Sequence, residues 1–323
     1  MHQPLLYDMK LLEEIEGGEE IDCLFLAAGT DLRAYEVLRK LDAKKIDIKK
    51  ILLFNFEERN QSIKNGDKYF DFKKTSFKNI DLVDCSIKDP VSCRVKLDAH
   101  MTSYDSNKLI ALDISCFTKP YFFYLLKYLH ERISISKPIV FYTEPFSYKF
   151  PKKGLFSSYH ESEGPIRIEE IPGFSGVRER GGVNVLVVQM GFESDSLDEI
   201  NFDFGPNESF FINGFPSYAP KFKDISLERN QYYTRNKDNI ILYSRANNPF
   251  EVFNLLEKVK SNFENAFINI APLGTKPMAL GACLFAIHNP NVKVVFPISD
   301  KYEKVTTDEC WNSWMYQVPL KFN

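Results

Sequence analysis

Apolar runs alternate with helix-like segments along the first half of the chain. Residues 21–29 (IDCLFLAAG) form a continuous apolar run, typical of a strand buried on both faces, and residues 30–41 follow with helical spacing. Residues 49–60 repeat the strand pattern, and after a polar, irregular stretch residues 108–132 read as strand, tight turn and helix. Residues 136–150 add another buried strand. The alternation predicts an α/β fold with a parallel sheet.

The second half repeats this order. Strand patterns begin at residues 183, 208, 239 and 265, and the last two are followed by helical segments. Residues 151–182 are rich in Gly, Pro, Ser and charge and have weak periodicity, which is typical of a connection. We therefore expect two Rossmann-like parallel-sheet halves related by an internal repeat: an N-terminal domain (1–150), a linker or hairpin excursion (151–182) and a C-terminal domain (183–323).

The tightest internal match is a Thr-Lys-Pro turn between a buried strand and an apolar helix. One copy contains Thr118 and Lys119, and the other contains Thr275 and Lys276. Self-similar halves indicate duplication and a pseudo-twofold arrangement. On this basis we expect the two turns to face one cleft.

The second copy of the turn has the composition of an anion site. Gly274 permits a tight turn, Thr275 can cap the helix, Lys276 carries a positive charge and Pro277 suits a first helical turn. Free N–H groups and the helix dipole then favour a phosphate. The alternative is a capping sequence whose lysine points to water. No GxxxxGK[ST] motif and no full GxGxxG after the first strand occurs, so ATP hydrolysis is not supported.

The two halves differ in their carboxylates. Asp113 ends a strand of the first half and Glu144 follows in the next, whereas the second half has Asn269 and the Pro297–Ile298 region in their places. Carboxylates at strand ends can act as a general acid or base, but they also pair with lysines or bind ribose hydroxyls. Both interpretations remain open from the sequence.

Other candidate ligand residues follow predicted strands. Arg33 belongs either to a ligand shell or to an exposed charged rim, and Glu193 follows the first strand of the second half. Tyr218 could stack on a base. Asn248 stands before a helix, where it is a natural cap.

Charge and motif content exclude several classes of function. A net charge of −3 and a pI near 6.0 argue against general affinity for duplex nucleic acid. The acidic first residues lack a signal peptide's apolar core, and no run is long enough for a membrane helix, so we expect a cytoplasmic protein without membrane contact. The six cysteines and five histidines show no zinc-ligand spacing. We therefore predict no metal and no cofactor.

Residues 267–287 resemble the CARF family, the CRISPR-associated Rossmann-fold sensor domains, in which a strand ends in a Gly-Thr-Lys turn before a helix. Members bind cyclic oligoadenylates across a two-domain interface. The resemblance implies that Gly274, Thr275 and Lys276 contact phosphate or ribose. Thr118 and Lys119 are weaker counterparts, since Phe117 replaces the glycine. The chain contains neither an attached nuclease nor a HEPN-type RxxxxH motif.

Three functions are compatible with these features. The first is a nucleotide-binding sensor or regulatory subunit, which the resemblance places in antiviral defence, with a nucleotide or cyclic oligonucleotide held between the halves. The second is an enzyme that cleaves such a signal with Asp113 or Glu144, and Lys119 as charge stabiliser. The third is a scaffold for a protein partner without a small ligand.

Overall fold

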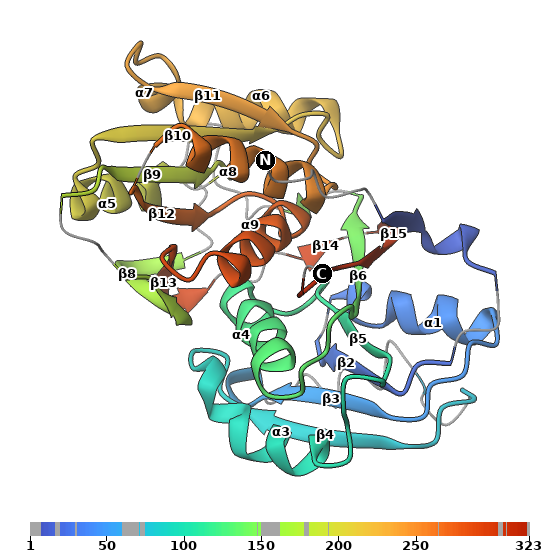
Figure 1. The fold of residues 1–323 in the computed structure, drawn as a ribbon. Coiled ribbons are helices and arrows are strands. Elements are labelled where there is room, and N and C mark those ends of the chain that lie inside the picture. The colour runs from blue at the N-terminus through green and yellow to red at the C-terminus, as the bar shows by residue number, and fades with distance from the viewer. Residues whose placement is uncertain are drawn as a thin grey trace. The chain divides into compact units, whose positions relative to one another are not determined.

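The computed structural model divides the chain into two compact units (Figure 1). The first unit consists of residues 8–148 and 306–323, and the second contains residues 149–305. Each unit is described by itself. The structure describes residues 8–321, apart from 17–19, 30, 60–70, 72–74, 147, 150–161, 178–180, 193, 264, 303–305 and 308.

The first unit is built on a seven-stranded sheet with the order β1-β15-β6-β5-β2-β3-β4. The strands from β6 to β4 are parallel, and β15 runs antiparallel to both β6 and β1. The strand bounds are β1 Met9–Leu11, β2 Cys23–Ala27, β3 Ile51–Phe56, β4 Ile80–Cys85, β5 Ile110–Asp113, β6 Ile139–Pro145 and β15 Cys310–Gln317.

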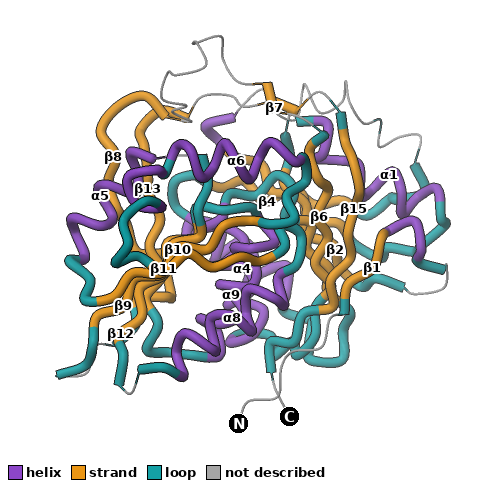
Figure 2. Tube along the Cα trace, turned by 90° about the horizontal axis from the view of Figure 1, so that it is seen from above, coloured by secondary structure: helices purple, strands orange, loops and turns teal. Residues whose placement is uncertain are grey.

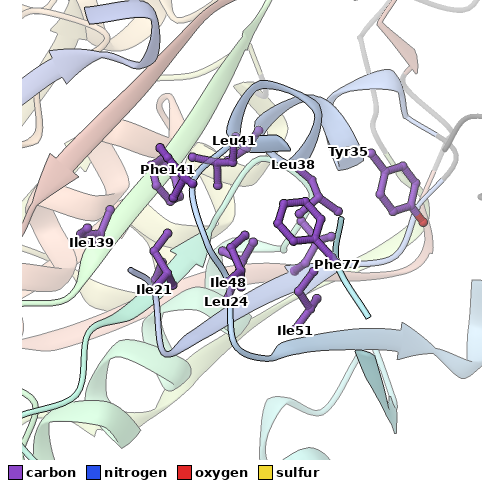
Figure 3. Close-up of a cluster of buried hydrophobic side chains, with 14 of the residues drawn as sticks. Ile21, Leu24, Tyr35, Leu38, Leu41, Ile48, Ile51, Phe77, Ile139 and Phe141 are labelled. Atoms are coloured by element: carbon purple, nitrogen blue, oxygen red, sulfur yellow. The ribbon is translucent and has the colours of Figure 1, made fainter. Parts of the chain in front are cut away.

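Helices cover both faces of this sheet. Helix α1 (Glu36–Ala43) packs on one face, where Leu38 and Leu41 join strand residues in a buried cluster (Figure 3). The other face carries α4 (Lys119–Glu131), and α3 (Arg94–Met101) is joined to α4 by the bond from Tyr128 Oη to Asp98 Oδ1 at 2.8 Å. Short 3-10 turns occupy Leu12–Glu14, Leu32–Tyr35, Glu57–Arg59 and Pro90–Cys93.

The second unit is built on a six-stranded sheet with the order β11-β10-β9-β12-β13-β8. All neighbours are parallel except β8, which runs antiparallel to β13. The bounds are β8 Ser162–Ser175, β9 Asn184–Gln189, β10 Glu208–Gly214, β11 Ile240–Ser244, β12 Phe267–Pro272 and β13 Lys293–Tyr302. A two-stranded sheet outside both large sheets pairs β7 (Tyr148–Lys149) with β14 (Thr306–Thr307), and Tyr148 and β14 belong to the first unit.

The helices of the second unit also lie in two layers, as Figure 2 shows for α6 and α8 on either side of the strands. Buried Leu197, Ile200 and Tyr233 bring α5 and α7 onto one face, while Gln189 bonds to α9 on the opposite face. The helix bounds are α5 Ser194–Phe204, α6 Pro220–Arg229, α7 Gln231–Thr234, α8 Pro249–Ser261 and α9 Lys276–His288.

Both parallel sheets have the same strand order. When the parallel strands of each unit are numbered along the chain, both sheets read 3-2-1-4-5, the doubly wound Rossmann arrangement. An antiparallel strand follows the fifth strand in each sheet, β15 in one and β8 in the other. The predicted α/β class with two Rossmann-like halves is therefore confirmed.

The residues that form each unit differ from the domain bounds proposed from the sequence. Residues 162–175 form β8 and extend the second sheet, although their composition is typical of a connection. Residues 310–317 form β15 and complete the first sheet, because β15 supplies hydrogen bonds to the open edge of β6. The irregular stretch before residue 108 also contains β4 and α3.

Candidate functional site

Each unit has one topological switch point, the place in a doubly wound sheet where ligands bind outside the strand ends. It lies between β2 and β5 in the first unit and between β9 and β12 in the second. The Thr-Lys-Pro turns follow β5 and β12 directly. Both turns therefore start a helix at a switch point.

In the second unit, the main chain of Ala246 joins the three loops that follow β10, β11 and β12. Its N–H donates to Pro216 C=O at 3.0 Å. Its C=O accepts from Tyr218 Oη at 3.1 Å and from Thr275 Oγ1. Three successive strand-end loops are thus fixed to the main chain of one residue, which holds the start of α9 in a defined position.

Glycines allow the main chain of neighbouring loops to approach closely at the carboxyl ends of the strands of the second unit, referred to below as this edge. A Cβ on Gly191 would lie 2.5 Å from Leu273 O, too close for any side chain. A Cβ on Gly274 would lie 3.2 Å from Met278 Sδ and 3.3 Å from Gln189 Cβ. The loops after β9 and β12 are therefore in direct contact, and Met278 fills the space beneath Gly274.

Two buried polar atoms at this edge lack a hydrogen-bond partner among the described residues. Gln189 Nε2 donates to Met278 C=O at 2.9 Å, which orients the amide and leaves Oε1 unpartnered. Ser244 Oγ, at the end of β11, is the other such atom. Leaving a buried acceptor unsatisfied costs about 1–3 kcal/mol, so each such atom needs an explanation, and a bound ligand is one.

The start of α9 has few main-chain donors for an anion. Pro277 has no N–H, and Met278 N–H donates to Thr275 Oγ1 at 3.3 Å. Thr275 is itself committed, since its hydroxyl also donates to Ala246 C=O. The positive charge at this helix start is the side chain of Lys276, which is half-buried at the first helical position. An anion here would be held by this lysine and the helix dipole.

The corresponding turn of the first unit is packed differently. Thr118 occupies the N-cap without a side-chain capping bond, and its buried Oγ1 has no partner among the described residues. Phe117, in the place of Gly274, is fully buried against Phe54 and Tyr121, with ring centroids 5.2 and 6.1 Å away. Lys119 begins α4 as predicted.

Asp113 belongs to a buried hydrogen-bond network. Its Oδ1 accepts from Ser115 N–H at 2.9 Å and from Ser115 Oγ at 2.5 Å. Ser115 Oγ also accepts from Thr143 N–H at 2.8 Å. Asp113 is 1% exposed, and these contacts fix the turn after β5. Asp113 thus has a structural role in this turn, and a catalytic role for it stays a prediction.

Glu144 and Arg33 each have an intramolecular partner. Glu144, 4% exposed, accepts from Trp314 Nε1 at 2.7 Å, which links β6 to β15. Arg33 forms a two-pronged pair with Asp31, through Nε at 3.1 Å and Nη2 at 2.8 Å. Arg33 is buried, so it does not belong to an exposed charged rim, and its place in a ligand shell stays a prediction.

The remaining candidates fall at different places. Tyr218 is half-buried and uses its hydroxyl to hold the Ala246 peptide. Glu193 lies outside the described residues. Asn248 caps α8 as predicted, since its Oδ1 accepts from Phe250 N–H at 3.0 Å and Glu251 N–H at 3.2 Å.

No protein-family model matches the chain, and no curated protein matches it. Among solved structures, it is similar to the cytoplasmic domain of a prokaryotic cation chloride cotransporter. That likeness has 10% sequence identity and a TM-score of 0.25, over 87% of this chain and 96% of the other. At so low a score it carries no conclusion, and the fold assignment rests on the strand order.

Burial makes the thiols poor nucleophiles. It raises the pKa of Cys23 and Cys93 to about 12, and that of Cys85 and Cys310 to about 11. These four groups stay protonated at neutral pH. Within the described ranges, no group of three His, Cys, Asp or Glu side chains could hold a metal ion, and no helix is long and apolar enough to cross a membrane.

Sequence reasoning missed the residues that organise the site. Ala246 acts through its main chain alone, so no side-chain pattern could have revealed it. Gln189 and Ser244 end apolar strands, and a polar residue at that position was the available signal. All three lie with Gly274 and Thr275 at the strand ends of the second unit.

Proposed function

We propose that this chain is a sensor or regulatory subunit that binds a phosphate-containing nucleotide at the strand ends of its second unit. The observation that carries the proposal is the main chain of Ala246, which fixes the loops after β10, β11 and β12 beside the switch point. Such a scaffold holds a ligand site in one geometry before the ligand arrives, which lowers the entropic cost of binding.

Different residues at these strand ends suit the phosphate of a nucleotide and its ribose or base. Lys276 supplies the positive charge for phosphate at the start of α9. Gln189 Oε1 and Ser244 Oγ suit a hydroxyl or amino group, because a carbonyl oxygen accepts hydrogen bonds and a hydroxyl both accepts and donates. A ribose or a base amino group has these donors.

The resemblance of residues 267–287 to CARF domains supports a cyclic or linear oligoadenylate as the ligand and a place in antiviral defence. A cytoplasmic location and a protein partner that receives the signal belong to the same proposal. Asp113 and Glu144 are not needed for it, since both have partners within the first unit.

Calorimetric titration tests the proposal with cyclic and linear oligoadenylates, mononucleotides and inorganic phosphate. Lys276→Met removes the charge but keeps the apolar stem, and we expect it to weaken binding about 10- to 100-fold, because a charged hydrogen bond contributes about 1.5–3 kcal/mol. Lys119→Met is the matched control in the first unit and should leave this affinity unchanged.

Two outcomes would contradict the proposal. One is that the native protein binds none of these compounds. The other is that Lys276→Met binds as tightly as the native protein. Mass spectrometry of the same mixtures separates binding from turnover, and a cleaved product whose formation is lost in Asp113→Asn or Glu144→Gln would favour the enzyme instead.

A further inference from the structure

The two large sheets end in four outer strands, and three of these carry features that discourage pairing with another chain. Strand β1 is only three residues long. Strand β4 has Asp81 and Asp84. Strand β8 has exposed Arg167 and Glu169 and a proline at position 172. Short length, charge and proline are the usual protections of sheet edges.

The fourth outer strand, β11, has none of these protections. Its sequence is Ile-Ile-Leu-Tyr-Ser, without charge, proline or glycine. It forms the outer edge of its sheet in Figure 1, and β10 is its partner among the described strands. Ile240 is 42% exposed and Tyr243 is 52% exposed. An unprotected apolar edge is a template for pairing with a further strand.

The main-chain direction of β11 defines which groups point outward. Phe215 N–H donates to Ser244 C=O at 2.7 Å, so the carbonyl of Ser244 points toward β10. Successive residues of a strand alternate, and the N–H and C=O of one residue point to the same side. Ile241 and Tyr243 therefore direct their N–H and C=O groups away from β10.

This pattern fits a second copy of the same strand. In an antiparallel pair with a two-fold axis at Leu242, Ile241 of one copy lies opposite Tyr243 of the other, and the two exchange N–H···O bonds. Their side chains form an aromatic and β-branched pair, a combination that stabilises antiparallel sheets. Leu242 meets its own symmetry mate on the opposite face.

Opposite charges flank the two ends of β11. Asp238 precedes the strand and Arg245 follows it, and both are exposed. Antiparallel pairing about Leu242 brings the strand end that follows Asp238 in one copy to the strand end that precedes Arg245 in the other. Asp238 itself lies opposite Ala246, one position from Arg245, so the attraction acts between the two strand ends and not between directly opposite side chains. Arg245 pairs with Glu251 through Nε at 3.2 Å, and its side chain is still 60% exposed.

We propose that this protein forms a two-fold dimer in which the β11 strands of two copies pair antiparallel about Leu242. The second-unit sheets of both copies then become one continuous sheet. The dimer is independent of ligand, so it can fail while the proposed nucleotide site stands, and the reverse is also true.

Light scattering coupled to gel filtration tests the oligomeric state of the full chain. We expect a dimer for the native protein and a monomer for Tyr243→Lys, because a lysine on an edge strand opposes pairing. The matched control is Leu82→Lys on β4, an outer-strand residue that is 49% exposed, and it should remain dimeric. A monomeric native protein, or a dimer that persists in Tyr243→Lys, would overturn the proposal.

Cysteine cross-linking tests the register. Residues opposite each other in a non-hydrogen-bonded antiparallel pair have Cα atoms about 4.5 Å apart, within the range of a disulfide. Leu242→Cys should therefore form a reducible covalent dimer on mild oxidation, and Ile240→Cys should not, since it faces Ser244. A native dimer without the Leu242→Cys cross-link, or with equal cross-linking of Ile240→Cys, contradicts the register.

Discussion

The two Thr-Lys-Pro turns share a tripeptide and use it in opposite ways. In the second unit the Thr275 hydroxyl accepts from Met278 N–H and donates to Ala246 C=O, so it both caps the helix and holds a neighbouring loop. In the first unit the Thr118 hydroxyl is buried without either contact among the described residues. The same capping sequence therefore links two loops by hydrogen bonds in the second unit, whereas in the first unit its threonine hydroxyl is only packed among buried side chains.

The residue before each threonine explains the difference. Gly274 lets the β12–α9 loop approach Gln189 and Met278 closely. Phe117 instead places an aromatic ring in the core against Phe54 and Tyr121. An identical motif thus predicts the helix start, while its neighbour decides whether the surrounding edge is polar or filled with aromatic rings.

The largest expected effect comes from removing the ring. Phe117→Ala should lower the free energy of unfolding of the first unit by about 3–5 kcal/mol, since it removes a fully buried aromatic side chain. Both tryptophans, Trp311 and Trp314, lie in β15, so tryptophan fluorescence during denaturation reports on this unit.

Gly274→Ala is the reciprocal change in the second unit. Its Cβ meets the flexible Met278 side chain at 3.2 Å, so we expect a cost of about 1 kcal/mol, measured by circular dichroism. Equal losses in the two variants would show that the neighbouring residue does not distinguish the turns.

Alkaline pH should weaken the first unit next. Cys23, Cys85, Cys93 and Cys310 all lie in the first unit, and burial raises each thiol pKa above its ordinary value of 9.0 to about 11 or 12. The folded state thus favours the protonated thiols. Their contribution to stability is complete below pH 9 and falls progressively from pH 9 until the pH has passed the folded-state values near 11 and 12.

We expect the two fully buried thiols, Cys23 and Cys93, to lower the free energy of unfolding of the first unit by about 2–3 kcal/mol together between pH 8 and pH 10, because each pH unit above the unfolded-state pKa costs about 1.4 kcal/mol per thiol. Tryptophan fluorescence at a series of pH values measures the change. The far-ultraviolet dichroism transition, which includes both units, should become broader as the first unit weakens. A fluorescence midpoint that is constant over this pH range would count against the buried thiols as the cause.

The smallest effect should come from the threonines. Thr275→Val removes a capping bond and should destabilise the start of α9 by about 1 kcal/mol. Thr118→Val replaces an unpartnered buried hydroxyl and should be neutral or slightly stabilising. Hydrogen exchange resolved by peptide mass spectrometry compares the first turns of α9 and α4, and a similar change in both helices would remove the distinction.

The central elements of both units could be predicted from the sequence because their strands are continuous apolar runs. The cap at Asn248 and both helix starts after Thr118 and Thr275 were predictable for the same local reason: capping chemistry acts within a few residues. The Glu144 partner was not, because Trp314 becomes its neighbour only through the pairing of β15 with β6. The bond from Ser115 to Asp113 is local, but the bond from Thr143 that completes this network also needs two strands to pair.

The outer strands of the two sheets could not be predicted from the sequence pattern, for a physical reason. Strand β4 is half-exposed, so its Asp81 and Asp84 interrupt the apolar run that marks a buried strand. Strand β8 combines exposed charge with glycine and proline, as a connection would. Strand β15 could be recognised as apolar, but its partner β6 lies about half the chain away, and sequence periodicity carries no information about such pairing.

The pairing of β15 with β6 also bears on the order of synthesis. The hydrogen bond between the Thr143 and Ser313 hydroxyls can form only after Ser313, 170 residues later in the chain, has left the ribosome. The second unit, whose strands all lie between residues 162 and 302, can complete its sheet earlier. A nascent chain stalled shortly before β15 would therefore carry one finished sheet and one with the edge of β6 still open to chaperones or to other chains.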